Sequence, residues 1–158
     1  VNIRQALMMS DLVVSASNST SSLIWPEHLK PGCVICDVAR PADVSRTVLD
    51  SRPDVLVIEG GLVSYPDKVS FGQNLGYDPG MNLACLSETM LLSLEGDYRD
   101  ISIGLKLPIE DIYYLKSLAR KHGFSLAVPQ NERGKITPEI AVAAKKAATC
   151  TDFHLKKA

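Results

Sequence analysis

The sequence has no long hydrophobic run. Its longest apolar stretch, Ala84 to Leu94, contains Glu88 and is well short of the roughly 20 apolar residues that a membrane-spanning helix needs. We therefore expect no integral membrane segment. The chain also has no internal repeat and no low-complexity tract.

An excess of charge of one sign is also missing. Seventeen Lys and Arg residues stand against eighteen Asp and Glu residues, which gives a formal net charge of −1. This balance argues against a protein that binds nucleic acid or a membrane surface through a basic field. Hydrophobic residues make up 46% and charged residues 22% of the 158, which is typical of a globular protein and excludes a disordered, collagen-like or coiled-coil chain. The length predicts one domain, or two small ones.

Cysteine is scarce, with four residues in the chain. The sequence also shows no signal-peptide pattern. This excludes a disulfide framework and predicts free thiols in the cytoplasm. Cys33 and Cys36 have the spacing of a Cys-x-x-Cys motif. In a strand, however, positions three apart point to opposite faces, and the chain has no second Cys or His pair at zinc spacing. We expect two core cysteines and no metal.

Three short apolar runs predict buried strands. They are residues 12–16, 33–38 and 55–59. Each run is continuously apolar, as in strands that are covered on both faces of a parallel sheet. Between the second and third runs, Pro41 to Leu49 predicts a short helix with Asp43 in its first turn. The fold class is therefore α/β, a Rossmann-like doubly wound parallel sheet followed by helices.

Helices dominate the second half of the sequence. The predicted helices are Met81 to Glu95, Pro108 to His122 and Thr137 to about Ala148. Acidic residues in the first turn of the middle helix, basic residues in its last turn and Gly123 after it match the helix dipole and a C-cap. We assign residues 1–128 to a nucleotide-binding domain with a catalytic helix, and residues 129–158 to a helical, partly frayed extension.

The glycine fingerprint G-x-G-x-x-G of a dinucleotide-binding fold is absent. The nearest glycine pair, Gly60-Gly61, follows the last predicted strand, and a complete fold of this type needs about six strands. The chain also begins at Val1 without a Met. We therefore expect the C-terminal half of the fold, with a phosphate-binding half upstream.

Small residues end the first predicted strand, which is where ligands approach a doubly wound sheet. A Leu-Lys-Pro-Gly segment then precedes a strand that ends in Asp37, an order found in the cofactor half of many NAD(P) dehydrogenases. The candidate cofactor-binding residues are Ser15, Ala16, Ser17, Val38, Gly60 and Gly61. The alternative is an ordinary polar loop, Ser-Asn-Ser-Thr-Ser-Ser, at residues 17–22.

Cys85 is the candidate nucleophile. On a helical wheel it falls opposite an apolar face and beside Glu88 and Thr89. The expected apolar face consists of Leu83, Leu86, Met90 and Leu94. A thiol near a helix start is favoured as thiolate, although a partly buried structural thiol is the alternative. A serine hydrolase is not supported, because the sequence has no G-x-S-x-G elbow.

Four segments carry a resemblance to a known family. In order they are residues 60–63, the block Asn-Leu-Ala-Cys-Leu-Ser-Glu-Thr-Met-Leu-Leu at 82–92, Leu-Glu-Gly at 94–96, and Arg-Lys-His-Gly-Phe at 120–124. Together they resemble the C-terminal half of the long-chain acyl-(acyl-carrier-protein) reductases and their bacterial relatives, described as amino-acid or shikimate-type dehydrogenases. The resemblance covers residues 5–127.

The resemblance implies an NADPH-dependent oxidoreductase that reduces a fatty acyl thioester, on acyl carrier protein or coenzyme A, to an aldehyde. The family's catalytic cysteine maps onto Cys85, with Glu88 in a positioning or proton-handling role. Two alternatives stay open: a non-covalent NAD(P)-dependent dehydrogenase of the shikimate or amino-acid type, and an inactive fragment. Homo-oligomer formation is also left open.

Overall fold

The computed structural model describes the chain apart from residues 1, 67–71, 73–75, 105 and 156–158, and it gives no side-chain environment for residues 150–155. Contacts divide the chain into two compact units. The first unit consists of residues 1–60 and 128–158, and the second consists of residues 61–127. The domain boundary predicted at residue 128 stays a prediction.

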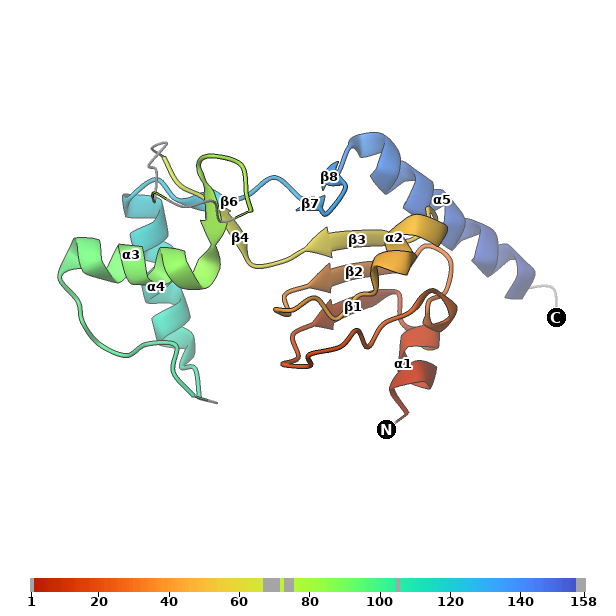
Figure 1. The fold of residues 1–158 in the computed structure, drawn as a ribbon, viewed down its shortest axis with the longest axis horizontal. Helices are drawn as coiled ribbons and strands as arrows, with labels where there is room; N and C mark the ends of the chain where they lie inside the picture. Colours follow the sequence, from red (N-terminus) through yellow and green to blue (C-terminus); the bar gives the residue numbers. More distant parts are fainter. Residues whose placement is uncertain (1, 67–71, 73–75, 105, 156–158) are drawn as a thin grey trace. The chain divides into compact units, whose positions relative to one another are not determined.

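The first unit contains a parallel sheet of strand order β1-β2-β3, whose three strands lie side by side in Figure 1. The strands are β1 (Leu12–Ser15), β2 (Val34–Asp37) and β3 (Leu56–Glu59), and Leu12 pairs with Val34, which pairs with Leu56. The other elements are helix α1 (Ile3–Met9), the 3-10 turn η1 (Pro26–His28), α2 (Arg46–Ser51), the hairpin β7 (Gln130–Asn131) and β8 (Gly134–Lys135), and α5 (Pro138–Leu155).

One face of this sheet forms the main core. Ile35 and Val57 are buried in a cluster with Leu7 of α1 and Val48 of α2, and Val13 packs against the cluster. The side chains of Leu12 and Val14 project to the other face of edge strand β1, where 64% and 67% of their surface is exposed. The apolar runs therefore predicted the strands, but β1 is not covered on both faces.

The C-terminal segment belongs to the first unit. Asn131 donates a hydrogen bond to the Val57 carbonyl of β3 at 3.0 Å. Gly32, with a φ of 76°, lies so close to Ala148 of α5 that a Cβ at position 32 would overlap it. The helix predicted to end near Ala148 continues to Leu155.

The helix predicted from Pro41 to Leu49 was misplaced, because α2 begins at Arg46. Ser45 is its N-cap and accepts a hydrogen bond from the Thr47 N–H. The preceding segment is fixed by side chains rather than by helical bonds, since Asp37 accepts the Val44 N–H at 2.9 Å. Asp43 is accordingly a buried loop residue, not a first-turn helix residue.

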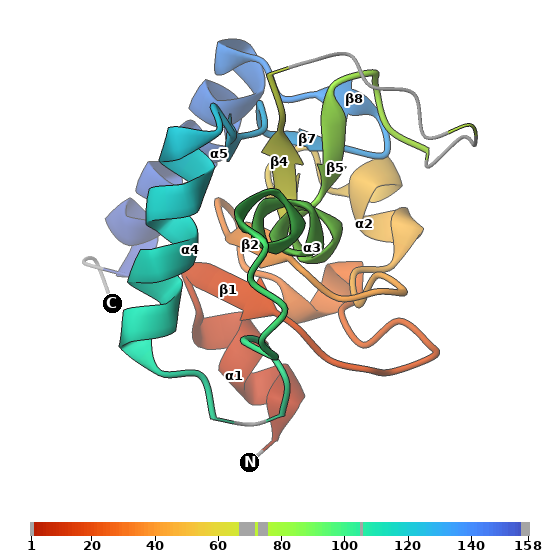
Figure 2. The ribbon, with the colours of Figure 1, turned by 90° about the vertical axis from the view of Figure 1, so that its left-hand side faces the viewer.

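The second unit combines a small antiparallel sheet with two helices. Its strands have the order β5-β4-β6 and are β4 (Leu62–Ser64), β5 (Met81–Leu83) and β6 (Ser125–Leu126). Helices α3 (Ala84–Glu95) and α4 (Ile109–Lys121) contact each other, and Figure 2 shows α3 along its axis with α4 beside it. The core of this unit contains Tyr65, Leu91, Leu118 and Phe124.

Helix α4 confirms the helix predicted from its terminal charges. The helix predicted from Met81 begins later, at Ala84, because Met81 to Leu83 pair with β4 instead. The mixed α/β fold with three parallel strands is confirmed, and its Rossmann-like arrangement stays a prediction. None of the helices in the described part of the chain combines the length and the apolar character needed to span a membrane.

Replacement of Asp37 by Ala is expected to lower the free energy of unfolding by about 2–4 kcal/mol. Asp37 is buried and accepts the N–H groups of Ala39 at 3.0 Å and Val44 at 2.9 Å, and each donor left without a partner costs about 1–3 kcal/mol. Urea unfolding at neutral pH measures the change. Asp37→Asn keeps one acceptor and should lose less, whereas equal losses in the two variants would contradict this explanation.

Candidate functional site

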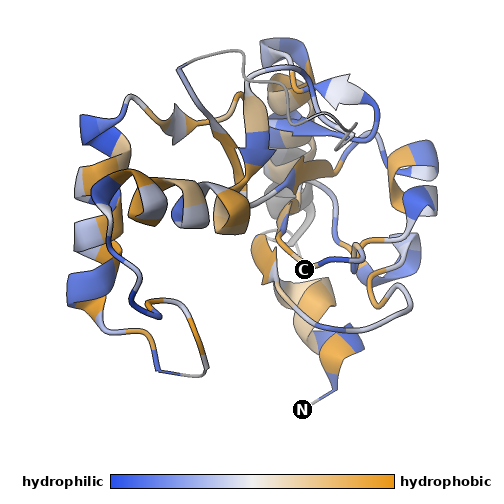
Figure 3. Cartoon of the chain, turned by 60° about the vertical axis from the view of Figure 1, so that its left-hand side comes forward, coloured by the Kyte–Doolittle hydropathy of each residue, from blue (hydrophilic) through white to orange (hydrophobic). Residues whose placement is uncertain are grey.

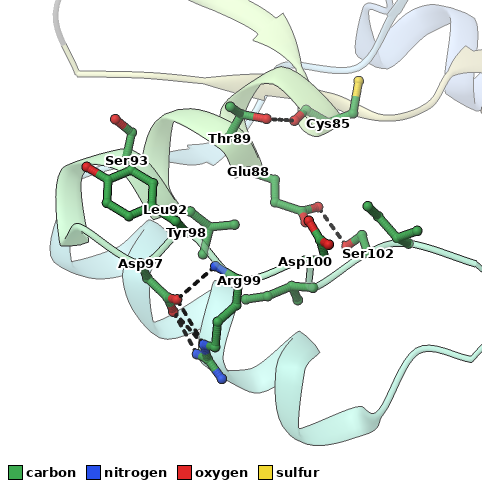
Figure 4. Close-up of a pocket in the computed structure, with 12 residues that line it drawn as sticks. Cys85, Glu88, Thr89, Leu92, Ser93, Asp97, Tyr98, Arg99, Asp100 and Ser102 are labelled. Carbon is green, nitrogen blue, oxygen red and sulfur yellow. Dashed lines mark hydrogen bonds and ion pairs between the residues drawn. The ribbon is translucent and has the colours of Figure 1, made fainter.

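A pocket of about 500 Å³ lies in the second unit, between α3 and the segment that follows it. We call it the Cys85 pocket (Figure 4). It is lined by Cys85, Glu88, Thr89, Leu92, Ser93, Asp97, Tyr98, Arg99, Asp100, Ile101, Ser102 and Ile103. The pocket thus combines a thiol with carboxylates and apolar side chains.

Cys85 is exposed and is the second residue of α3. The N-cap residue is Leu83, which makes no side-chain capping bond to the first turn. The Ala84 N–H is bonded to the Gly61 carbonyl at 2.7 Å. The N–H groups that follow it at the helix start carry partial positive charge, which favours a thiolate or an oxyanion nearby. The position predicted for a nucleophile is therefore chemically suitable.

The structure does not bring the functional groups of Cys85 and Glu88 together. In Figure 4 the Cys85 sulfur points away from the Glu88 carboxylate. Glu88 instead accepts a hydrogen bond from the Ser102 hydroxyl at 2.8 Å, and Thr89 donates to the Cys85 carbonyl at 3.3 Å. Ser102 has no local sequence signal, because it approaches Glu88 from a loop fourteen positions away.

An ion pair fixes the loop that forms one wall of the pocket. Asp97 accepts hydrogen bonds from Arg99, at 2.9 Å from Nε and 2.6 Å from Nη2, and from the Tyr114 hydroxyl of α4 at 2.9 Å. The hydrogen bonds from Arg99, followed by that from Tyr114, hold the pKa of Asp97 well below its usual value despite some desolvation. The Arg99 guanidinium also lies 5.4 Å from the Tyr114 ring centre.

The apolar face predicted for α3 is wrong in part. Leu86 and Leu94 are 43% and 60% exposed, while Ser87 and Leu91 are buried. The side of α3 that carries Ser87 and Leu91 faces inward, because Leu91 packs in the core of the second unit. Among the described residues, Ser87 Oγ is the buried side-chain oxygen without a hydrogen-bond partner.

A second pocket, of about 380 Å³, lies in the first unit beside strand β1, and we call it the β1 groove. Its lining residues come from α1, from β1, from the segments before and after β1, and, in the case of Asp43, from the loop before α2. They are Ile3, Ala6, Leu7, Ser10, Leu12, Val13, Val14, Ser15, Ala16, Ser17, Leu23, Ile24 and Asp43. The groove therefore brings together three of the predicted cofactor-binding residues, and α1 beside it is mostly hydrophobic (Figure 3).

Asp43 organises the polar end of the β1 groove. It is fully buried and accepts hydrogen bonds from the Ser15 hydroxyl, the Ser17 hydroxyl at 2.5 Å and the Ser17 N–H at 3.1 Å. Burial alone raises the pKa of Asp43, but the hydrogen bonds from the two serines outweigh burial and lower it. Asp43 was not among the predicted site residues, because its sequence position resembles a helix start.

The other predicted cofactor residues, Val38, Gly60 and Gly61, are not part of the lining of the β1 groove. Val38 and Gly60 are neighbours at the carboxyl ends of β2 and β3, where a Cβ on Gly60 would come within 2.8 Å of both Cys36 Sγ and Val38 Cγ2. Close packing thus accounts for Gly60. Gly61, in the second unit, has a φ of 72° and accepts the Ala84 N–H at 2.7 Å, so it sets the start of α3.

The Cys33 and Cys36 thiols are free. Cys33 is fully buried in the main core, which confirms its predicted place there, and burial raises the pKa of its thiol. Cys36 is half-buried beside Gly60. These positions make both thiols less accessible than that of Cys85.

No family model matches this chain. Over 112 residues it is 36% identical to a protein of Serratia sp. (strain ATCC 39006) named aminotransferase PigE. The matched region covers 69% of this chain but 13% of the Serratia protein. The chain is therefore similar to one segment of a much longer protein that is named as an enzyme.

Asp43→Asn is expected to make the free energy of unfolding depend less on pH in the acidic range. A carboxyl whose pKa is lowered by folding stabilises the protein above its unfolded value of about 3.9, and this stabilisation disappears as the pH falls through the folded value. The wild-type protein should therefore be more stable than Asp43→Asn at pH 7, with a gap that narrows below about pH 4. Urea unfolding between pH 7 and pH 3 measures it. The exposed Asp50→Asn is the control, and a gap that does not change with pH would contradict the role of Asp43.

Cys85 is expected to react with iodoacetamide at least about tenfold faster than Cys33, because Cys85 is exposed at a helix start and Cys33 is fully buried. Cys33 and Cys36 share one tryptic peptide, so timed alkylation is followed by tandem mass spectrometry, whose fragment ions resolve the individual thiols. In urea the difference should disappear, which serves as the control. Alkylation of Cys33 at the rate of Cys85 under native conditions would show that the described burial is wrong.

Proposed function

We propose that this chain is part of an NADPH-dependent oxidoreductase that reduces an acyl thioester to an aldehyde through an acyl-cysteine intermediate. The observation that carries the proposal is Cys85, an exposed thiol in the first turn of α3 on the wall of a pocket of about 500 Å³. The proposed substrate is an acyl group on acyl carrier protein or coenzyme A, and the proposed location is the cytoplasm.

The first step is acyl transfer to Cys85. The thiolate attacks the thioester carbonyl, a new carbon–sulfur bond forms, and the carrier thiol leaves with the electron pair of the bond that breaks and takes up a proton. The N–H groups at the start of α3 stabilise the negative charge that develops on the carbonyl oxygen. Apolar side chains such as Leu92 and Ile101 provide a surface for the acyl chain.

The second step releases the aldehyde. When bound, NADPH supplies a hydride to the acyl carbon. The carbon–sulfur bond then breaks, its electrons return to Cys85 as thiolate, and the aldehyde departs. Glu88 does not act as the base for Cys85 in this scheme, because it is held by Ser102; it shapes the pocket and repels anionic groups.

The residues of the first unit fit NADPH in part. The proposed Rossmann-like sheet has Ser15, Ala16 and Ser17 at the carboxyl end of β1, where a cofactor approaches. The two serine hydroxyls, whose protons are directed to Asp43, suit amide or sugar groups. They do not suit phosphates, and no described Lys or Arg residue lines the β1 groove to compensate phosphate charge.

The similarity to a segment of an aminotransferase supports an aldehyde product. Aminotransferases exchange an amino group with a carbonyl compound, so a segment that makes an aldehyde would supply the acceptor. Transamination itself depends on a lysine that holds the cofactor, and none of the lysines that the structure describes lines the Cys85 pocket or the β1 groove. We therefore assign reduction rather than transamination to this chain.

A non-covalent NAD(P)-dependent dehydrogenase is the second candidate. The direction of the Cys85 sulfur favours it, because the Glu88 carboxylate is then not placed to accept the thiol proton. The two candidates differ in whether the acyl group becomes attached to the protein.

Single-turnover labelling with a radioactive acyl thioester tests the covalent mechanism. Without NADPH, the wild-type protein should retain label on the peptide that contains Cys85, and addition of NADPH should convert the label to aldehyde. Cys85→Ser should lose both label and aldehyde by about 10²-fold or more, because a hydroxyl is far from ionised near neutral pH.

The matched control is Cys36→Ser, which changes another thiol of the same chain and should label as the wild type does. Absence of label in the wild-type protein, or aldehyde formation by Cys85→Ser at a comparable rate, would reject the covalent mechanism. Aldehyde formation that persists in Cys85→Ser would establish the non-covalent candidate in its place.

A further inference from the structure

We infer that the β1 groove binds a neutral primary carboxamide and rejects carboxylates and phosphates. This inference rests on the proposed function in one respect, since the carboxamide that it assigns is that of a nicotinamide cofactor. Which groups of the groove can donate a hydrogen bond to a ligand, and which can only accept one, follows from the hydrogen bonds within the protein.

The two serines at the end of β1 have no proton to offer a ligand. Each serine hydroxyl has one proton, and those of Ser15 and Ser17 are directed to the two carboxylate oxygens of Asp43. The remaining lone pairs can only accept, and one lone pair of Ser17 already accepts the Ser19 N–H at 3.1 Å. A ligand that contacts these hydroxyls must therefore donate.

Asp43 cannot turn away to release these protons. Its side chain is fully buried and also accepts the Ser17 N–H, while its carbonyl accepts the N–H groups of Leu23 at 2.8 Å and Ile24 at 3.0 Å. The lowered pKa keeps the carboxyl ionised at neutral pH. Its negative charge disfavours any anion beside the serines.

The third hydroxyl of the groove has the same polarity. Ser10 donates its proton to the Ala6 carbonyl at 2.7 Å, so its oxygen can only accept as well. The remaining side chains of the lining are apolar apart from Asp43. An anion in this groove would therefore face hydroxyl lone pairs and a carboxylate without a cationic partner.

Hydrogen-bond donors come from the backbone of β1. The Asp11 and Ser15 carbonyls accept bonds from the residues around β2, so the backbone groups of odd-numbered residues face β2. The backbone groups of Leu12 and Val14 point the opposite way, toward the unpaired edge of the sheet, because β1 is an edge strand. An edge N–H can donate to an amide carbonyl while a serine oxygen accepts from the amide NH₂, and a primary carboxamide satisfies both.

A matched pair of ligands tests the inference, because nicotinamide and nicotinate differ in whether the ring carries a carboxamide or a carboxylate. In two-dimensional NMR of the ¹⁵N-labelled chain, nicotinamide should shift the amide signals of Ser15 to Ser17 in a saturable manner. Nicotinate and inorganic phosphate should bind at least tenfold more weakly. Equal or tighter binding of either anion, or no saturable shift with nicotinamide, would overturn the inference.

Variants of the groove locate the effect. Ser15→Ala and Ser17→Ala should each weaken nicotinamide binding several-fold, and Ser22→Ala, in the same loop but outside the groove lining, should not. Asp43→Asn should gain affinity for nicotinate, because the Asn amide donates a proton and frees a serine proton to point outward. If Asp43→Asn does not fold, the two serine variants decide, and unchanged binding in both would reject the site.

The result can be separated from that of the proposed function. The two experiments have separate readouts, since one follows label on the peptide that contains Cys85 and the other follows the amide signals of Ser15 to Ser17. Failure of acyl labelling with intact nicotinamide binding would reject the thioester mechanism alone. Acyl labelling with no preference for nicotinamide over nicotinate would reject the carboxamide groove alone.

Discussion

Two buried carboxylates hold the loops at one end of the parallel sheet. Asp37 ends β2 and accepts the N–H groups of Ala39 and Val44, and Asp43 accepts from Ser15 and Ser17 after β1. Backbone donors and hydroxyls that would otherwise be buried without partners are satisfied in this way. The start of α2, the path of the loop after β1 and the polarity of the β1 groove all depend on these charges.

One carboxylate in each unit sets the direction of the hydrogen bonds around it. Asp43 fixes the direction of two hydroxyl protons, and in the second unit Asp97 fixes Arg99 and Tyr114. In both units an acidic side chain determines what neighbouring polar groups can still offer a ligand. The Cys85 pocket and the β1 groove therefore owe their polarity to hydrogen bonds within the protein.

Local patterns in the sequence predicted some elements and could not predict others. The three parallel strands and α4 were predictable, because continuous apolar runs and terminal charges act within a few residues. Strand β5 was not, since Met81 to Leu83 suit a helix equally well and become a strand only by pairing with β4. The helical wheel predicted that Cys85 lies on the polar side of its helix, and the thiol is exposed. The bond from Ser102 to Glu88 and the place of Asp43 depend on partners distant in sequence.

The close approach of Gly32 to Ala148 has a consequence for how the protein is made. The first unit consists of two stretches of chain separated by the whole of the second unit, and Asn131 and α5 complete its contacts. A ribosome synthesises residues 61–127 before it reaches these segments. During translation the contacts that residues 128–158 make with the first unit are therefore missing until after residues 61–127 have been synthesised. Chaperones that recognise exposed apolar strands would find their target in this interval.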